Sequence, residues 1–245
     1  ECIMIMDQIS TDYYGIEYTP SRLTSTIEDF YGKRTDILKY LSKRYDYKSY
    51  LEIGCDLDEN FEQVKTEFTT VVGVDPISGG THRMTSDEFF QQNDQLFDLI
   101  YIDGDHKSEQ VWKDITNSLL FLKEGGTIVL HDLNPRLEER QNPEQEGTGK
   151  VWNGDAWKAA VAFRLVSDYE IIVVDIDHGC GIIRKRPNQH PLLEAWQRGL
   201  IEIGPLPNQT LPGTHSLEYI DLEEHREQIL RLMSLVEMRE WLEES

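Results

Sequence analysis

The stretch FDLIYIDGDH, residues 97–106, is an apolar run that ends abruptly in two acids, a glycine and a histidine. Its apolar side chains fall on both alternating faces, which is typical of a strand buried on both sides in a parallel sheet covered by helices. In an open α/β sheet, ligands bind beyond the carboxyl ends of the strands. The polar residues from Asp103 to His106 are therefore candidate site residues.

Strand-like and helix-like patterns alternate on either side of this stretch. Further short apolar runs predict strands at residues 49–54, 70–74, 127–130, 170–174 and 181–183. Apolar residues at helical spacing predict helices at 27–45, at 111–122 before the Gly125-Gly126 pair, and at 155–166. This alternation predicts an α/β fold with a doubly wound sheet. The last two strands, separated by a turn at 177–179, predict an antiparallel hairpin at the sheet edge.

The chain length of 245 residues fits one domain, which we expect to span residues 1–245 with a core at about 27–186. A loop rich in Pro, Asn and Gly follows at 187–215. After it, apolar residues from Leu222 to Leu242 predict a final amphipathic helix. We expect this helix to pack on the domain, and the alternative is a dimer contact in a homo-oligomer.

The chain is strongly acidic, with 45 Asp and Glu against 24 Lys and Arg and a net charge of −21. Binding to nucleic acid or to an anionic membrane depends largely on Lys and Arg, so no nucleic acid or membrane partner is expected. No apolar run is long enough for a transmembrane helix, and the start of the sequence does not fit a signal peptide. Three cysteines without a CxxC spacing favour a reduced, cytoplasmic protein.

The residues after the first two strands indicate the type of cofactor. Gly54 allows a tight turn, and Asp75 lies 23 residues beyond Glu52, where an acid can accept hydrogen bonds from ribose hydroxyls. No further glycine follows Gly54 closely, and the acids at 56–59 would face a pyrophosphate, which argues against NAD or FAD. S-adenosyl-L-methionine carries a ribose, an ammonium and a sulfonium but no phosphate. It therefore suits this acidic edge better.

Five ordered motifs resemble those of class I S-adenosylmethionine-dependent methyltransferases. They are YLEIGCDLDENF (50–61), VVGVDP (71–76), SDEFF (86–90), FDLIYIDGDHKSEQVWKDI (97–115) and LKEGGTIVLHD (122–132). The nearest branch includes macrocin O-methyltransferase-like and cephalosporin-hydroxylase-like proteins. The resemblance implies a Rossmann-like sheet of seven strands, mostly parallel with an antiparallel C-terminal hairpin. The sequence departs from many members at Asp56 and Asp58, where they carry glycine.

The resemblance also implies roles for individual residues. Glu52 and Gly54, with their neighbours Cys55 and Asp56, would line the methionine end of the cofactor. Asp75 would hold the ribose. The remaining cofactor contacts would come from Ser86 and Asp87 beside the adenine and from Asp103 near the amino group and the methyl.

Several of these residues have a purely structural alternative. Gly54 could serve only the turn, and Asp75 could cap the turn that begins at Pro76. Asp105 is expected to be the N-cap of the helix that begins near Lys107. His106 could be a surface residue of the first helical turn, and Cys55 a small buried filler.

Methylation of a hydroxyl needs a base or a bound cation to remove the acceptor's proton. His106 and His131 are the candidate bases, with Asp103 beside them. Asp103 and Asp132 could share a hard cation such as Mg2+. The resemblance places His131 where metal-dependent relatives carry an acid, and a neutral imidazole is a poorer Mg2+ ligand.

The segment 133–154 carries charge, Pro and Gly but little apolar pattern, and it is a candidate lid over the acceptor. Lys150, Trp152 and Lys158 would then contact the acceptor. The sequence thus predicts methyl transfer to a small molecule, at a hydroxyl of a sugar or secondary metabolite. The alternatives are an NAD-type oxidoreductase on the same fold and a non-catalytic binding protein with a methyltransferase fold.

Overall fold

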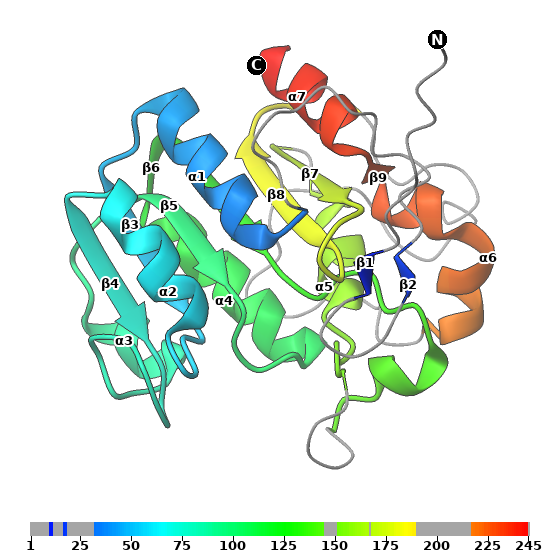
Figure 1. Ribbon diagram of the computed structural model, residues 1–245, viewed down its shortest axis with the longest axis horizontal. Helices are drawn as coiled ribbons and strands as arrows, with labels where there is room; N and C mark the ends of the chain where they lie inside the picture. The colour runs from blue at the N-terminus through cyan, green and yellow to red at the C-terminus, as the bar shows by residue number, and fades with distance from the viewer. Residues whose placement is uncertain are drawn as a thin grey trace, which may run out of the picture.

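The computed structural model describes residues 10–11, 17–18, 32–144, 151–166, 168–189 and 217–244 (Figure 1). Near the N-terminus, β1 (Ser10–Thr11) and β2 (Glu17–Tyr18) pair as a short antiparallel ribbon. No helix in the described part of the chain is long and apolar enough to cross a membrane.

A sheet of seven strands forms the centre of the fold, in the order β4-β3-β5-β6-β8-β7-β9. The strands are β3 (Ser49–Ile53), β4 (Thr70–Val74), β5 (Phe97–Ile102), β6 (Leu122–Leu130), β7 (Tyr169–Val174), β8 (Cys180–Lys185) and β9 (Leu232–Met233). Only β8 is antiparallel to its neighbours, and it forms a hairpin with β7. The predicted Rossmann-like, mostly parallel seven-stranded sheet with an antiparallel hairpin is therefore confirmed. The hairpin does not form the sheet edge as expected, because β9 pairs with β7 beyond it.

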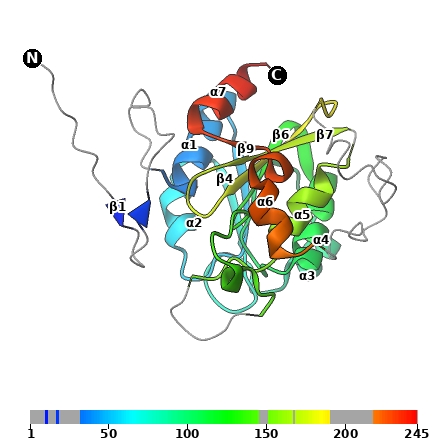
Figure 2. The same cartoon turned by 90° about the vertical axis from the view of Figure 1, so that its right-hand side faces the viewer.

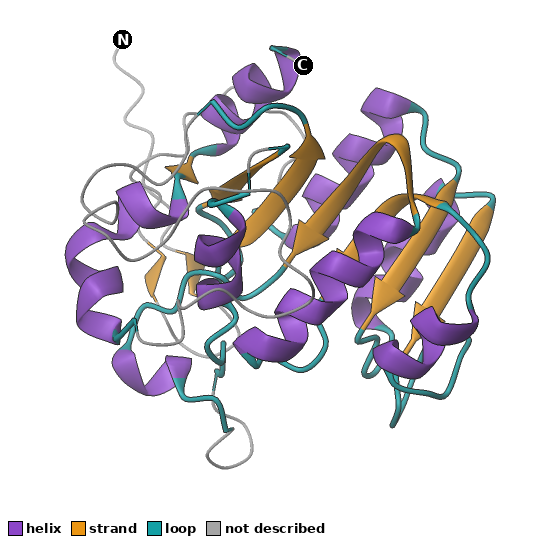
Figure 3. Cartoon of the chain, turned by 180° about the vertical axis from the view of Figure 1, so that it is seen from behind, coloured by secondary structure: helices purple, strands orange, loops and turns teal. Residues whose placement is uncertain are grey.

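Helices cover both faces of this sheet (Figures 2 and 3). They are α1 (Arg34–Tyr45), α2 (Glu59–Val64), α3 (Ser86–Gln92), α4 (Ser108–Leu120), α5 (Trp157–Phe163), α6 (Tyr219–Leu230) and α7 (Leu235–Glu243), with short 3-10 turns η1 (Lys65–Glu67) and η2 (Glu138–Gln141). Apolar side chains of α1, α2 and α7 pack on one face, and those of α3, α4, α5 and α6 on the other. The strands are buried on both faces because each face has its own helical layer.

The C-terminal segment differs from the single helix that the sequence predicts. α6 ends at Leu230, and the residue that caps it, Arg231, has a left-handed backbone with φ +51°. Leu232 and Met233 then pair with the end of β7 and supply the seventh strand, and Ser234 caps α7 with its side chain. Two short helices thus flank an edge strand, and both bury apolar residues in the core.

Three other element boundaries also need correction. The helix expected to run to residue 122 ends at Leu120, and the Gly125-Gly126 pair lies within β6 instead of ending the helix. β6 begins at Leu122 because it pairs with Phe97 before the register shifts. α1 begins at Arg34, and residues 27–31 of the expected helix lie outside the described residues, as do Lys150 and residues 190–215.

Candidate active site

The carboxyl ends of four parallel strands lie level with one another. Ile53 of β3 stands opposite both Val74 of β4 and Ile102 of β5, and Ile102 stands opposite Leu130 of β6. The next residue of each strand is therefore brought to one edge of the sheet. These residues are Gly54, Asp75, Asp103 and His131, which the sequence proposes as site residues.

Gly54 makes the turn at the end of the central strand. Its φ is +85°, and a Cβ atom there would overlap the main-chain carbonyl oxygen of Asp103. Its N–H donates to Val74 O at 2.9 Å, while Asp103 N donates to Ile53 O at 2.8 Å. Glycine is needed at position 54 because both the backbone angle and the close approach of the two strand ends exclude a side chain.

Asp75 uses its carboxylate to bind backbone N–H groups of its own loop and of the loop after β3. Oδ1 accepts hydrogen bonds from the backbone N–H groups of Ile77 (2.8 Å) and Ser78 (2.9 Å), and Oδ2 accepts one from Asp56 (3.0 Å). Burial alone would raise the pKa of Asp75, but these N–H donors outweigh it and lower the pKa. The turn-capping alternative is thus realised, and contact with a ribose stays a prediction.

The two acids that depart from the family pattern hold the neighbouring loops together. Asp56 and Asp58 both have left-handed backbones, with φ of +45° and +63°. Oδ1 of Asp58 accepts from the backbone N–H of Gly80 at 2.6 Å, and Oδ1 of Asp56 accepts from the Ser78 hydroxyl at 3.4 Å. Cys55, which directly precedes Asp56, is buried, as expected for a small core residue.

Glu52 is buried within β3, at 1% exposure. Its Oε2 accepts hydrogen bonds from the Tyr50 hydroxyl (2.5 Å) and from Asn60 Nδ2 (2.9 Å). Burial raises the pKa of Glu52 to about 8, against the opposing effect of these two hydrogen bonds. A cationic group bound beside Glu52 would favour its ionised form and would in turn be stabilised by it.

Ser86 and Asp87 lie at the start of α3, where they contact α4. Gln110 Nε2 of α4 donates toward Ser86 Oγ (3.2 Å), Asp87 Oδ1 (3.3 Å) and Oδ1 of the buried Asp114 (3.1 Å). Sequence reasoning did not identify Gln110 or Asp114. Helical spacing places Gln110 and Asp114 on one face of α4. Only the folded chain shows that α3 lies against this face.

The N-cap prediction for Asp105 is wrong. α4 begins after Lys107, and its first residue, Ser108, is held by Asp155. Ser108 N donates to Asp155 Oδ1 at 2.6 Å and its hydroxyl donates to Oδ2 at 3.0 Å. An acid 47 residues away in the sequence therefore replaces the local cap.

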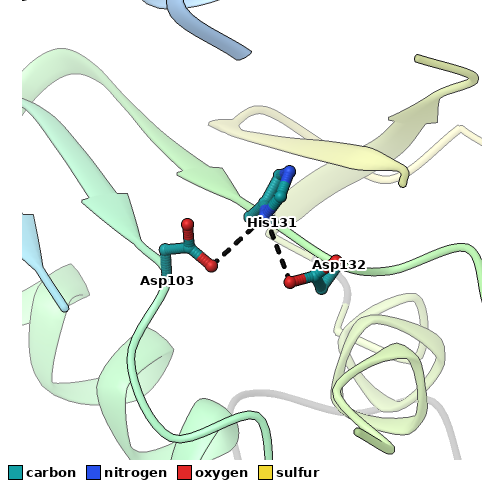
Figure 4. Close-up of side chains that lie close together, drawn as sticks. All are labelled: Asp103, His131 and Asp132. Carbon is teal, nitrogen blue, oxygen red and sulfur yellow. Dashed lines mark hydrogen bonds and ion pairs between the residues drawn. The ribbon is translucent and has the colours of Figure 1, made fainter. Parts of the chain in front are cut away.

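Asp103, His106, His131 and Asp132 come together as a closed ring of alternating carboxylates and imidazoles, which we call the four-residue cluster. His131 Nδ1 lies 3.2 Å from Asp103 Oδ1 and 3.2 Å from Asp132 Oδ2 (Figure 4). His106 Nε2 lies 3.3 Å from the same Asp103 oxygen and 3.4 Å from the same Asp132 oxygen. The cluster unites all three catalytic candidates with both metal candidates.

The two carboxylates strongly affect the protonation of the imidazoles. Burial lowers the pKa of both histidines, but the nearby carboxylates of Asp132 and Asp103 outweigh it and raise both values, that of His131 well above its usual range. Burial alone would raise the pKa of Asp103. Its neighbours outweigh this effect, and His131 contributes most, so the pKa of Asp103 is held well below its usual range. The carboxylates therefore favour the protonated form of both imidazoles.

A second layer of residues, which the sequence analysis did not select as site residues, supports the cluster from outside. The Tyr101 hydroxyl donates to Asp103 Oδ2 at 2.9 Å, and Asn153 Nδ2 donates to Asp132 Oδ1 at 2.6 Å. Arg34 Nε lies 3.9 Å from Asp103 Oδ2, and its Nη1 lies 3.2 Å from Asp177 Oδ2. Tyr101 was readable as a strand residue, but nothing in the sequence connects residue 34 with residues 103 and 177.

The second half of the candidate lid rests on the cluster. The Trp152 ring stacks on His106, with centroids 4.7 Å apart, and its carbonyl oxygen lies 3.2 Å from His106 Nδ1. A Cβ atom at Gly154 would overlap the carbonyl oxygen of His106, so the two main chains also touch. Lys158 Nζ lies 3.8 Å from Asp155. Trp152 is thus a neighbour of the cluster, whereas its contact with an acceptor stays a prediction.

Comparisons with known proteins bear on this site. A family model described as a methyltransferase domain matches residues 26–133. No curated protein matches the chain. Among solved structures, a methyltransferase from Podospora anserina bound to S-adenosylhomocysteine is 14% identical, with a TM-score of 0.48, and the match covers 62% of this chain and 78% of that one.

Two further structures are similar to the same degree. The O-methyltransferase TomG from Streptomyces achromogenes, in complex with S-adenosylmethionine, is 14% identical, with a TM-score of 0.47 and coverage of 62% and 79%. An O-methyltransferase from Bacillus cereus is 14% identical, with a TM-score of 0.42 and coverage of 63% and 80%. Residues 26–133 thus resemble a methyltransferase domain, and they contain four of the seven strands of the Rossmann-like sheet.

Proposed function

We propose that the chain, folded as a single methyltransferase-like domain, transfers a methyl group from S-adenosyl-L-methionine to a hydroxyl of a small molecule, such as a sugar or a secondary metabolite. The observation that carries the proposal is the line of Gly54, Asp75, Asp103 and His131 along the carboxyl ends of four adjacent strands. This line lies within the segment that matches the methyltransferase family. The acidity of the edge suits a cationic cofactor and opposes a pyrophosphate.

The cofactor is assigned to the side of this edge formed by β3 and β4. Glu52 and Asp103 would face the methionine ammonium and the sulfonium, whose positive charges both acids favour. Asp75 would accept hydrogen bonds from the ribose, since a carboxylate can accept more than the three bonds that it accepts from backbone N–H groups here. Ser86 and Asp87, held by Gln110, would lie beside the adenine.

The acceptor is assigned to the side of β5 and β6, next to the four-residue cluster. Methyl transfer is an in-line displacement, so positioning of the acceptor oxygen does most of the work. The hydroxyl must also lose its proton. The carboxylates raise the pKa of both His106 and His131 and so favour their protonated forms, which means that either histidine can act as the base only after it has released its own proton. A bound cation would supply a different route, since it would lower the acceptor's pKa.

Mg2+ fits this donor set only in part. Asp103 and Asp132 supply oxygen atoms, which Mg2+ prefers, but the two nitrogens of His106 and His131 complete the ring. Mg2+ at Asp103 and Asp132 therefore stays a prediction, which calorimetric titration with Mg2+ tests.

A non-catalytic binding protein with the same fold is the second candidate. It is favoured by Asp75, whose carboxylate is engaged by three backbone N–H groups of its own region. An NAD-type oxidoreductase is disfavoured by the single glycine at the turn. For partners and location, the proposal includes a small-molecule acceptor and a cytoplasmic setting without nucleic acid, while a homo-oligomer stays a prediction.

Calorimetric titration with S-adenosylhomocysteine tests the proposal. Asp75→Ala should weaken binding about 10- to 100-fold, since a hydrogen bond to a charged group contributes about 1.5–3 kcal/mol. Asp75→Asn, which keeps the size of the side chain, should weaken it less, and the exposed Asp105→Ala serves as the control. His106→Ala should abolish methyl transfer with cofactor affinity unchanged. Unchanged affinity in a folded Asp75→Ala variant would overturn the site assignment.

A further inference from the structure

We infer that the methyl acceptor is an anionic small molecule, carrying a phosphate or a carboxylate group, and that Arg140 binds this group beside the four-residue cluster. The inference rests on the proposed function, because it names the class of molecule that the acceptor side of the site takes. It is carried by the arginines that lie around the segment after β6, in a chain whose net charge is −21.

Three arginines lie around this segment, and only one of them pairs with a carboxylate of a described residue. Arg136 and Arg140 belong to the segment itself, and Arg226 of α6 donates to its main chain. Arg136 pairs with Asp175, which directly follows β7. Within the described part of the chain, no ion pair therefore balances the charges of Arg140 and Arg226.

Arg226 is held by neutral oxygen atoms. It donates to Asn134 Oδ1 at 2.5 Å, to Pro135 O at 2.7 Å and to the Tyr219 hydroxyl at 3.3 Å. Burial lowers the pKa of Arg226, and the positive charge of Arg136 acts in the same direction. The segment after β6 is thus a locally positive region, which a bound anion would stabilise.

The guanidinium of Arg140 forms no hydrogen bond or ion pair with any residue that the structure describes. Arg140 lies in η2 and is half-buried. Glu138 and Glu139 precede it in the same turn, but both are exposed and neither pairs with it. Polar groups withdrawn from solvent normally have hydrogen-bond partners. Because the planar fork of a guanidinium matches a carboxylate or a phosphate, the open fork of Arg140 fits an anionic ligand.

Arg140 lies close to the four-residue cluster. Its carbonyl oxygen accepts a hydrogen bond from Asn153 N at 2.9 Å, and Asn153 Nδ2 donates to Asp132 at 2.6 Å. The His178 ring lies edge-on to His131, with centroids 6.2 Å apart. Burial is the main cause that lowers the pKa of His178, and the charge of Arg140 adds to it. An anion on Arg140 would therefore lie within the length of one small molecule from the cluster.

Opposite charges on the acceptor side favour a molecule with two different ends. Asp103 and Asp132 suit the end that carries the reacting hydroxyl, and Arg140 suits an anionic end. A neutral acceptor would leave Arg140 unpaired, whereas the net charge of −21 would repel an anion that had no positive group to bind. Arg140 would thus fix the far end of the acceptor and orient its hydroxyl.

The test is calorimetric titration of the full chain with inorganic phosphate and, separately, with acetate, both at constant ionic strength. We expect one anion per chain with a dissociation constant on the order of 1 mM, since a bidentate pair supplies two charge-assisted hydrogen bonds. Arg140→Gln should weaken binding at least about 10-fold. Arg140→Lys keeps the charge but loses the fork, so it should weaken binding less. Tighter binding of phosphate would indicate a phosphorylated acceptor, and tighter binding of acetate a carboxylate.

Arg239→Gln supplies the matched control, because it removes the same charge from α7, outside the acceptor side. Arg239 is half-buried, and its guanidinium lies over the Tyr40 ring at 5.7 Å. This variant should bind phosphate and acetate like the unmodified chain. Circular dichroism checks that each variant is folded. No saturable binding of either anion by the folded chain, or equal affinities of folded Arg140→Gln and Arg239→Gln, would overturn the inference.

Titration of the same samples with S-adenosylhomocysteine separates this inference from the proposed function. Arg140→Gln should bind S-adenosylhomocysteine like the unmodified chain, since Arg140 lies on the acceptor side. Cofactor binding without anion binding would overturn the inference alone. Anion binding without cofactor binding would support the anion site and contradict the proposed methyl transfer.

Discussion

Asn153 Nδ2 donates a 2.6 Å hydrogen bond to Asp132 Oδ1, and both side chains are buried. The bond joins residues 151–155, which include the end of the candidate lid and which we call the strap, to the residues that follow β6. Trp152 and Gly154 of the strap also touch His106, and Asp155 caps α4, so this bond is one of several contacts that hold the strap over the cluster.

Asn153→Ala should lower the free energy of unfolding by about 1–3 kcal/mol, because it leaves a buried carboxylate oxygen without its donor. Urea unfolding measures the change. Gln63→Ala is the control, since the Gln63 amide donates to Glu59 O on an exposed helix surface and its loss should cost less than about 0.5 kcal/mol. Equal effects of the two substitutions would show that the strap is not held at Asp132.

Gly54→Ala should destabilise the fold by about 2–5 kcal/mol and eliminate binding of S-adenosylhomocysteine. A positive φ costs an alanine about 1–2 kcal/mol, and the overlap with Asp103 adds to it. Gly125→Ala isolates the first contribution, because Gly125 has φ +75° but no atom within 4 Å of the position that a Cβ atom would take. If the two variants are equally stable by urea unfolding, the close approach at Gly54 is not real.

Glu170 anchors the C-terminal segment near the start of β7, away from the site. Its carboxylate accepts from Arg186 Nε at 2.6 Å, Arg231 Nη1 at 3.1 Å and Trp241 Nε1 at 3.0 Å. Glu170→Gln should cost about 3 kcal/mol of unfolding free energy, because it leaves two mostly buried guanidinium groups uncompensated. Glu124→Gln removes an exposed pair with a lysine and should cost at most about 1 kcal/mol.

Cofactor affinity provides the check on where Glu170 acts. A folded Glu170→Gln chain should bind S-adenosylhomocysteine like the unmodified chain. Loss of binding without loss of stability would mean that Glu170 belongs to the site.

Stability should fall as the pH rises from about 4 to about 7, and Asp114 should account for part of the fall. Burial raises the pKa of Asp114 from 3.8 to about 7. In this range the folded chain keeps a proton that the unfolded chain has lost, so rising pH favours unfolding, by at most about 4 kcal/mol for this group. The asparagine side chain in Asp114→Asn carries no charge at any pH, so this variant should lose the part of the pH-dependent fall in stability that Asp114 causes.

Urea unfolding of both chains at about pH 4.5 and about pH 8, on either side of most of this range, measures the difference. Glu52, with a raised pKa of about 8, contributes in the same direction, so some decline should persist in Asp114→Asn. An identical decline in both chains would show that Asp114 is ionised when folded.

The central strands could be predicted from the sequence because each is an apolar run on both faces. β5, the stretch that ends at Asp103, is an example, and its carboxyl end also located the candidate site. β9 could not be predicted, because a strand of two residues has no pattern of its own. It exists because the left-handed Arg231 ends α6 beside the free edge of β7.

Part of the site could be predicted because the apolar runs show where the strands end. Asp103, His131 and Asp132 follow strand ends, so the rule for ligand positions found them. His106 was found with them, but its place between the two carboxylates depends on the strap at 151–155. The contact of Arg34 with Asp177 joins residues 143 positions apart, and only the folded chain brings them together.

Thermal unfolding with and without S-adenosylhomocysteine, with NAD as the control, tests the central claim most directly. At about 100 times its dissociation constant, a ligand adds about 2.7 kcal/mol of stability, which for a chain of this size is a shift of roughly 5 to 11 °C. We expect that shift with S-adenosylhomocysteine and none with NAD. No shift with S-adenosylhomocysteine, in the metal-free and in the metal-loaded chain, would contradict the proposed function, and a shift with NAD alone would replace it with a dinucleotide-binding one.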